Sequence, residues 1–221
     1  MTFPRQISPS VLSADFSRLG EQIQSVVEGG GEVLHLDVMD GNYVPNLTFG
    51  PLLVKAIRKL TDMELEAHLM ISNPDQYIEN FIKAGADIVL VHPSTCKNVD
   101  HTLAKIRALG AKAGLVVNPD EDMSIVTPYL MTMDQLLIMS VYPGFGGQSF
   151  IPEVLNELPG FLSELEQHKV LVEIDGGINS STLPALIDSG IHRFVAGSAV
   201  FNKIDTPSNN FQHLQNLVTS V

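Results

Sequence analysis

Histidine and carboxylate residues alternate with apolar residues in three short segments of the sequence, at 33–39, 65–70 and 170–175. These polar residues are His35, Asp37, Glu66, His68, Glu173 and Asp175. Alternate residues of a β-strand lie on the same face, so each segment would place its polar side chains on one side. A buried imidazole or carboxylate costs free energy unless a partner compensates for it. The pattern therefore predicts a polar site to which all three segments contribute.

Four of these residues have the chemistry of metal ligands. They are His35, Asp37, His68 and Asp175, which fall at or near the carboxyl ends of their segments. Imidazole nitrogens and carboxylate oxygens bind first-row divalent ions such as Zn²⁺, Fe²⁺, Mn²⁺ or Co²⁺. One alternative is a sheet with a solvated face, and another is a set of core histidines that hydrogen-bond to neighbouring carboxylates. Because the pattern recurs in three segments, we predict one divalent metal ion per subunit.

Three glycine-rich stretches predict a site for an anion. Their residues are Gly144, Phe145, Gly146, Gly147, Gly176, Gly177, Gly197 and Ser198. Glycine lets backbone N–H groups approach a phosphate closely, and a short helix predicted from Ala199 would add the positive end of its dipole. The stretch 144–149 could instead act as a lid over the site. The alternative is that all three stretches are plain turns.

Strands and helices alternate along the whole sequence. The predicted strands are 7–12, 33–39, 65–70, 88–92, 112–117, 136–141, 170–175 and 193–197. Stretches with an apolar period close to 3.6 predict helices at 16–27, 52–60, 77–84 and 103–109, and Gly85, Gly110 and Gly190 are predicted helix stops. Ser10, on the first predicted strand, would face inward and could bond a substrate hydroxyl or a neighbouring strand.

Parallel strands joined by helices form either an open doubly wound sheet or a closed barrel. Eight units in 221 residues, with no Gly-x-Gly-x-x-Gly turn after the first strand, favour the barrel. We therefore predict a single-domain TIM (β/α)8 barrel over residues 1–221. Its chemistry is expected at the carboxyl ends of the strands.

The composition excludes several other classes of protein. A formal net charge of −12 disfavours nucleic acid and anionic membranes as partners. No apolar run approaches the roughly 20 residues that span a bilayer, and Met1–Gln6 does not look like the start of a signal peptide. The one cysteine, Cys96, cannot form an internal disulfide, so we expect a cytoplasmic protein.

Five motifs together resemble the ribulose-phosphate 3-epimerase family. They are SPSVLSADF at 8–16, HLDVMDG at 35–41, HLM at 68–70, PGFGGQ at 143–148 and EIDGG at 173–177. The resemblance runs from about residue 7 to residue 202, in the family's order and spacing. Two positions differ from the usual pattern: Tyr142 stands where Asn is more frequent, and Pro93-Ser94 follows His92 where many members carry a pair ending in Glu.

The resemblance implies a barrel of the ribulose-phosphate-binding type and the interconversion of D-ribulose 5-phosphate and D-xylulose 5-phosphate in the pentose phosphate pathway. It implies that His35, Asp37, His68 and Asp175 bind the metal, and that Asp37 and Asp175 transfer protons through an enediolate. The residues implied to contact the phosphorylated ketose are Ser10, His68, Gly144, Phe145, Gly146, Gly147, Asp175, Gly176, Gly177, Gly197 and Ser198. We also expect a homo-oligomer.

Other functions on the same scaffold remain open from the sequence. A 3-epimerase for a hexulose phosphate such as D-allulose 6-phosphate shares the same catalytic residues. A sugar-phosphate decarboxylase of the orotidine-phosphate decarboxylase type uses Asp-x-Lys-x-x-Asp, whereas Asp37-Val38-Met39-Asp40 contains no lysine. A non-catalytic sugar-phosphate sensor would have lost one carboxylate of the pair, and both are present.

Overall fold

The computed structural model describes residues 3–219, so residues 1–2 and 220–221 of the predicted 1–221 domain lie outside the described residues. The described residues form eight strands in one sheet. The strands are β1 (Gln6–Pro9), β2 (Val33–Met39), β3 (Glu64–Met70), β4 (Ile88–Val91), β5 (Lys112–Val117), β6 (Gln135–Met139), β7 (Leu171–Asp175) and β8 (Arg193–Ala196). Their order is β1-β8-β7-β6-β5-β4-β3-β2, and every neighbouring pair is parallel. A parallel bridge between Ser10 and His35 joins the two ends of this order, which confirms the predicted barrel.

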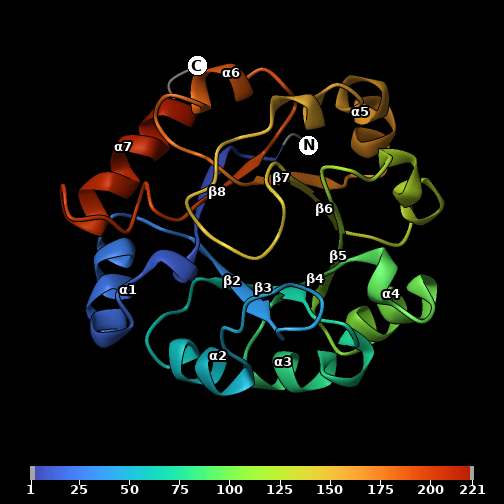
Figure 1. Cartoon of the computed structure of the whole chain (residues 1–221), viewed down its shortest axis with the longest axis horizontal. Coiled ribbons are helices and arrows are strands. Elements are labelled where there is room, and N and C mark those ends of the chain that lie inside the picture. The colour runs from blue at the N-terminus through green and yellow to red at the C-terminus, as the bar shows by residue number, and fades with distance from the viewer. Residues whose placement is uncertain (1–2, 220–221) are drawn as a thin grey trace.

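Helices surround the barrel (Figure 1). The α-helices are α1 (Leu19–Glu28), α2 (Pro51–Arg58), α3 (Ile78–Ala84), α4 (Val99–Ala108), α5 (Leu158–Gln167), α6 (Leu183–Leu186) and α7 (Pro207–Thr219). Short 3-10 helices lie in the connections before α1 and between later elements: η1 (Val11–Ser13), η2 (Phe16–Arg18), η3 (Pro74–Gln76), η4 (Pro93–Thr95), η5 (Met123–Tyr129) and η6 (Pro152–Leu155). Gly85 ends α3 with a φ of +115°, the left-handed stop expected there. No helix among residues 3–219 is long and apolar enough to cross a membrane.

The first predicted strand is too long at its carboxyl end. It was expected to reach Leu12, but β1 ends at Pro9 and η1 follows. Ser10 caps that 3-10 helix, because its Oγ accepts a hydrogen bond from the backbone N–H of Leu12 at 3.3 Å. Ser10 still bridges to His35, and the 3-10 helix that its side chain caps takes the place of the strand predicted for Val11 and Leu12.

Apolar residues pack on both sides of the strands. Leu34, Leu36 and Val38 belong to the large core between the strands and the surrounding helices. A separate buried cluster includes Leu90 and Leu137. The odd-numbered residues of β2 alternate with the first group, so they face the barrel interior. The predicted alternation on β2 thus places His35 and Asp37 inside.

Candidate active site

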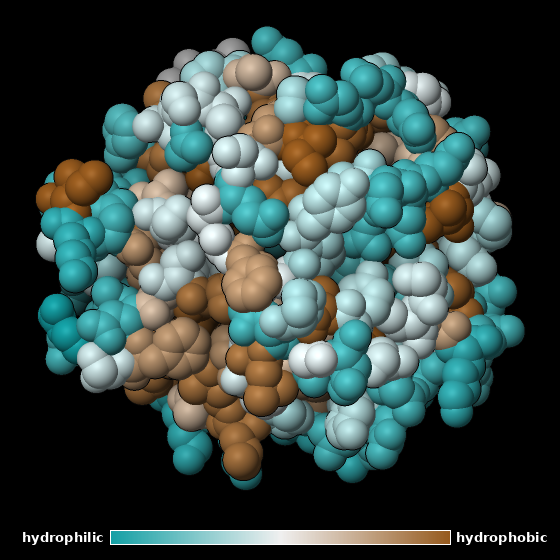
Figure 2. All heavy atoms as spheres, viewed as in Figure 1, coloured by the Kyte–Doolittle hydropathy of each residue, from teal (hydrophilic) through white to brown (hydrophobic). Residues whose placement is uncertain are grey.

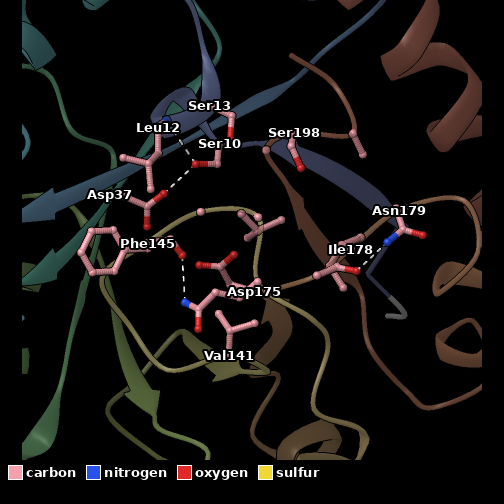
Figure 3. Close-up of a pocket in the computed structure, with 18 of the residues that line it drawn as sticks. Ser10, Leu12, Ser13, Asp37, Val141, Phe145, Asp175, Ile178, Asn179 and Ser198 are labelled. Carbon is pink, nitrogen blue, oxygen red and sulfur yellow. Dashed lines mark hydrogen bonds between the residues drawn. The ribbon is translucent and has the colours of Figure 1, made fainter. Parts of the chain in front are cut away.

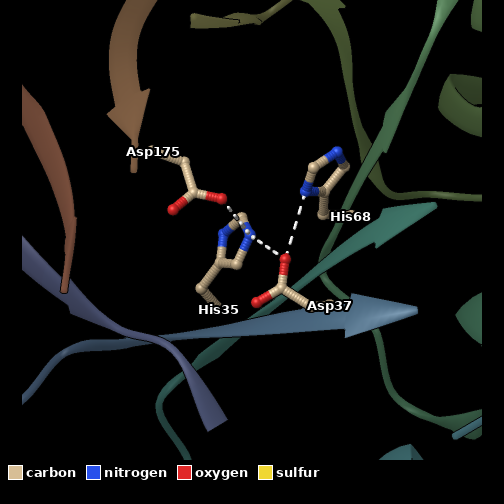
Figure 4. Close-up of side chains that lie close together, drawn as sticks. All are labelled: His35, Asp37, His68 and Asp175. Carbon is tan, nitrogen blue, oxygen red and sulfur yellow. Dashed lines mark ion pairs between the residues drawn. The ribbon is translucent and has the colours of Figure 1, made fainter. Parts of the chain in front are cut away.

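The structure brings together the four side chains that the sequence grouped as metal ligands (Figure 4). His35 and Asp37 lie on β2, His68 lies on β3, and Asp175 ends β7. One ligand atom from each lies within 4.8 Å of the others. Asp37 pairs directly with His68 in the parallel register of β2 and β3, which brings two of the four into contact.

Two imidazole nitrogens of this cluster make no hydrogen bond to any residue that the structure describes. His35 Nε2 and His68 Nδ1 are buried, and each lies 3.3 Å from Oδ1 of Asp37. His35 Nε2 also lies 3.7 Å from Oδ2 of Asp175. Buried polar atoms normally have a hydrogen-bond partner, whereas these nitrogens lie beside carboxylate oxygens without making a hydrogen bond to them. A divalent cation would take both lone pairs and the carboxylate oxygens, and the cluster fits such a site.

The two carboxyl groups have pKa values displaced in opposite directions. Burial alone would raise the pKa of Asp37, but the charge of His35 holds it far below its ordinary value. Burial and the charge of Asp37 raise the pKa of Asp175 to about 7. Burial opposes the protonation of His35, yet the charge of Asp37 raises the pKa of His35 well above its ordinary value. An ionised carboxylate beside a carboxyl group whose pKa lies near neutrality is suited to acid and base chemistry.

The ring nitrogens of His35 and His68 that do not face the ligand cluster have different partners. Nδ1 of His35 lies 2.7 Å from Oε1 of Glu66. Burial would raise the pKa of Glu66, but the hydrogen bond from His35 and the charge of Arg193 lower it to about 2. Glu66 is therefore ionised and accepts the hydrogen bond. Nε2 of His68 instead lies 2.9 Å from Nε2 of His92, a fully buried residue just beyond β4 that the sequence analysis did not identify.

Asp37 and Asp175 also line a cavity of about 550 Å³ (Figure 3). Ser10 Oγ donates a hydrogen bond of 2.6 Å to Oδ2 of Asp37 at its wall. The predicted site residues in the wall are Ser10, Asp37, Gly144, Phe145, Gly146, Gly147, Asp175, Gly176, Gly177, Gly197 and Ser198. His68 is fully buried and does not belong to the wall, so its contact with a substrate stays a prediction.

The loops after β6, β7 and β8 form one side of this cavity. The loop after β6, yellow in Figure 1, is tied down where Asn46 Nδ2 donates a hydrogen bond of 2.7 Å to the backbone oxygen of Gly144. Gly177 has a φ of +65°, and a Cβ there would lie 2.5 Å from the backbone nitrogen of Phe150. Glycine at this position is therefore required by packing as well as by any ligand.

The short helix predicted from Ala199 is wrong. The chain forms a turn over 198–200, in which the backbone N–H groups of Val200 and Phe201 both donate to the oxygen of Gly197 at 2.9 Å. Asn202 Nδ2 donates to the backbone oxygens of Ser198 and Ala199. These carbonyls would be needed by a continuing helix, so the asparagine side chain ends the turn.

The cavity wall also contains polar residues that the sequence analysis missed. They include Ser13, Asn179, Asn202, Asn210 and His213. His213 is exposed on α7 and also lines the cavity. No local pattern marks these residues, because only the packing of α7 beside the barrel brings two of them to the wall.

The fold and the cluster define a (β/α)8-barrel enzyme with a candidate divalent-metal site. The sequence model of the ribulose-phosphate 3-epimerase family matches residues 6–201, and the chain belongs to that family. It is 45% identical over 203 residues to the ribulose-phosphate 3-epimerase of Bacillus subtilis, covering 90% of this chain and 94% of that protein. It is 48% identical over 200 residues to the enzyme of the same name from Synechocystis, covering 89% and 87%.

Solved structures of lower sequence identity share the fold. KGPDC from Streptococcus mutans superposes with a TM-score of 0.72 at 16% identity, covering 99% of both chains. The 3-hexulose-6-phosphate synthase of Salmonella typhimurium gives 0.70 at 17% identity, covering 97% of this chain and 99% of the other. These similarities support the barrel architecture alone.

Proposed function

We propose that this protein interconverts D-ribulose 5-phosphate and D-xylulose 5-phosphate, with Asp37 and Asp175 as the two proton-transferring groups. The observation that carries the proposal is the pair itself. Two carboxyl groups from β2 and β7 meet at the wall of one cavity, one ionised and the other with a pKa raised to about 7. Membership of an epimerase family supports the same reaction.

Epimerisation beside a ketone needs a base on one face of carbon 3 and an acid on the other. One aspartate takes the proton from carbon 3, and electron density moves to the carbonyl oxygen of carbon 2 to give an enediolate. The other aspartate then returns a proton to the opposite face, and the two exchange roles in the reverse direction. Asp37 lies on β2 and Asp175 ends β7, two strands that are not neighbours in the barrel, which agrees with this division of roles. Ser10 holds one oxygen of Asp37 by its 2.6 Å hydrogen bond and so restricts the rotation of that carboxylate.

His35, Asp37, His68 and Asp175 would hold the divalent cation. When bound, it would act as a Lewis acid that stabilises the negative charge developing on the substrate oxygens. The donor set suits Zn²⁺, and also Fe²⁺, Mn²⁺ or Co²⁺.

The phosphate group of the substrate is proposed to bind mainly to backbone N–H groups around Gly176, Gly177, Gly197 and Ser198. Among the described residues, the cavity wall contains no lysine or arginine. Glycine backbone can approach a phosphate closely enough for its N–H groups to donate hydrogen bonds to it.

The test is turnover in deuterated water with the metal content measured on the same sample. D-ribulose 5-phosphate and D-allulose 6-phosphate are supplied in parallel. We expect the pentose phosphate to be converted faster, with deuterium entering at carbon 3 because the returned proton comes from a second, solvent-exchanged carboxyl group. Chelation should abolish turnover, and Zn²⁺, Mn²⁺, Co²⁺ or Fe²⁺ should restore it.

Three results would contradict parts of this proposal. Full activity in protein shown to be metal-free would show that the reaction needs no metal ion. Retention of the original hydrogen at carbon 3 would exclude the two-base mechanism. Faster conversion of D-allulose 6-phosphate replaces the pentose phosphate by the hexulose phosphate as substrate.

We propose further that the protein is a cytoplasmic homo-oligomer. The free Cys96 agrees with a reducing compartment. Phe16, Leu47 and Leu52 are exposed to 49%, 74% and 87%, and Figure 2 shows hydrophobic residues gathered over the region of α1 and α2. Exposed apolar area of this kind is typical of protein interfaces. Light scattering on the purified protein should give a multiple of the 24.0 kDa chain mass, and a monomer would refute the proposal.

A further inference from the structure

His92 is a buried imidazole whose place in the barrel the proposed reaction leaves unexplained. It is fully buried, and its Nδ1 has no hydrogen-bond partner among the described residues. Its one side-chain hydrogen bond joins its Nε2 to Nε2 of His68 at 2.9 Å. A hydrocarbon ring would fill this space without burying polar atoms, so the nitrogen that meets His68 is the reason for a histidine here.

The position of the His92 ring is fixed from several sides. Its backbone oxygen accepts hydrogen bonds from the hydroxyl of Thr95 at 2.8 Å and from the N–H of Thr95 at 3.0 Å. The ring packs against Tyr43 with centroids 4.8 Å apart and stacks on His68 with centroids 5.1 Å apart. The Tyr43 hydroxyl in turn accepts a hydrogen bond from Asn118. His92 therefore presents Nε2 to His68 with little freedom to turn away.

A hydrogen bond between two imidazole nitrogens needs a proton on one and a lone pair on the other. His68 Nδ1 is the nitrogen that faces Asp37 and the ligand cluster, so binding a cation requires a lone pair on Nδ1. A neutral ring then carries its proton on Nε2, which must donate. The acceptor within reach is Nε2 of His92.

His35, the other candidate histidine ligand, has a carboxylate as the partner of its second ring nitrogen, Nδ1. Nδ1 of His35 lies 2.7 Å from Oε1 of Glu66, and a carboxylate can only accept, so a neutral His35 ring with its proton on Nδ1 has its Nε2 lone pair toward the cluster. The partner of His68 is another imidazole, which can accept or donate. The tautomer of His68 is therefore set by the tautomer of His92.

We propose that His92 is a positioning residue, which accepts the Nε2–H of His68 and so keeps the Nδ1 lone pair of His68 available to a divalent cation. This inference rests on the metal site of the proposed function. Such hydrogen bonds behind a ligand typically affect metal affinity by about 10- to 100-fold.

The test begins with zinc titration of the full chain against a competing chelator. His92→Phe keeps a planar ring but has no acceptor, and we expect it to weaken zinc binding about 10- to 100-fold. His92→Gln places an amide oxygen near the position of Nε2, and we expect it to recover most of that affinity. The matched control is His192→Phe, because His192 is a half-buried histidine away from the cluster whose Nδ1 accepts from the N–H of Val172. The control should bind zinc like the unmodified protein.

The second measurement uses the unmodified protein and does not depend on the folding of any variant. Long-range ¹⁵N–¹H correlation spectra of the zinc-loaded protein report which nitrogen of each histidine carries a proton. We expect His68 to be protonated at Nε2 and His92 at Nδ1. A proton on Nε2 of His92 overturns the proposal, as does wild-type zinc affinity in His92→Phe or equal weakening in His92→Gln. Failure of the unmodified protein to bind zinc, manganese, cobalt or iron overturns the metal site itself and is recognised separately.

Discussion

Two layers of polar side chains occupy the barrel interior, and their buried carboxylates are compensated by different kinds of positive group. The ligand layer consists of His35, Asp37, His68 and Asp175, toward the carboxyl ends of the strands. The arginine layer lies toward the amino ends and consists of Glu66, Gln135, Glu173 and Arg193, all buried. In the arginine layer, Arg193 Nη1 donates to Glu66 at 3.0 Å, and the Gln135 amide donates to both Glu66 and Glu173.

The difference lies in the source of positive charge. The arginine layer contains a permanent cation, and burial together with the charge of Glu66 raises the pKa of Glu173 well above its ordinary range, so that this carboxyl group stays neutral. In the ligand layer, no lysine or arginine among residues 3–219 forms an ion pair with Asp37 or Asp175. Inward-facing carboxylates alone therefore do not mark a functional site. The ion-pair partners of Asp37 and Asp175 are the titratable imidazoles of His35 and His68, so a bound cation would add the permanent positive charge that the arginine layer already contains.

The largest expected effect comes from removing one proton-transferring carboxylate of the ligand layer. Asp37→Asn or Asp175→Asn should each lower kcat by at least about 10²–10⁴-fold, because each removes an acid/base group and changes a candidate ligand. Steady-state kinetics measure the change, circular dichroism checks the fold, and Asp188→Asn on the surface is the control. A folded, metal-loaded variant that keeps more than about a tenth of the rate has lost under roughly 1.4 kcal/mol, which would exclude the two-aspartate assignment.

The opposite result is expected in the arginine layer, where a substitution should lower the free energy of unfolding and have a smaller effect on kcat. Arg193→Met leaves Glu66 buried without its cation, and we expect the free energy of unfolding to fall by about 3–5 kcal/mol. Urea denaturation measures this loss, and the exposed Arg107→Met serves as control. If Arg193→Met is as stable as the control, the two layers do not differ in the way described.

A smaller effect is expected at the phosphate end of the cavity, beyond both layers. A Cβ at residue 197 would lie 2.5 Å from Oγ of Ser13, and the larger side chain of Gly197→Val would block close approach to the backbone. We expect KM to rise about tenfold or more, equivalent to about 1.4 kcal/mol, with a smaller change in kcat. Gly160→Ala, where a Cβ meets open space, is the matched control. An unchanged KM in folded Gly197→Val would show that the loop after β8 does not bind the phosphate.

The smallest effect is expected at Asp40, a carboxylate that the chain satisfies completely by itself. Burial alone would raise its pKa, but hydrogen bonds from Ser72, Tyr43 and Asn42 hold the pKa of Asp40 well below its ordinary value. A lowered folded pKa stabilises the protein above the unfolded value of about 3.9 and loses that contribution as pH falls toward the folded value.

Asp40→Asn should therefore cost about 1 kcal/mol of unfolding free energy at pH 7, and the difference from wild type should shrink as the pH falls below about 4. Urea denaturation at several pH values measures it, with the exposed Asp62→Asn as control. A cost that does not vary with pH would show that the hydrogen bonds do not depend on the charge of Asp40.

The sequence by itself determined which side chains share a face of each strand. The period of two in 33–39 places His35 and Asp37 together, and the same period in β3 places Glu66 and His68 together, because alternation is a local property of extended backbone. The repeat of strands and helices likewise predicted the barrel. Where a side chain caps a 3-10 helix, as Ser10 does just after β1, the local pattern gave the wrong boundary.

Only the tertiary structure decided which polar groups compensate one another. Glu66 and Arg193 are 127 residues apart, and His68 on β3 is 24 residues from His92, which lies just beyond β4. Their contacts depend on the register between strands and on closure of the barrel, which no local pattern encodes. The placement of His213 at the cavity wall depends in the same way on the packing of α7. Strand periodicity therefore identified the inward-facing residues, while barrel closure separated a layer with its own cation from a layer that fits an added one.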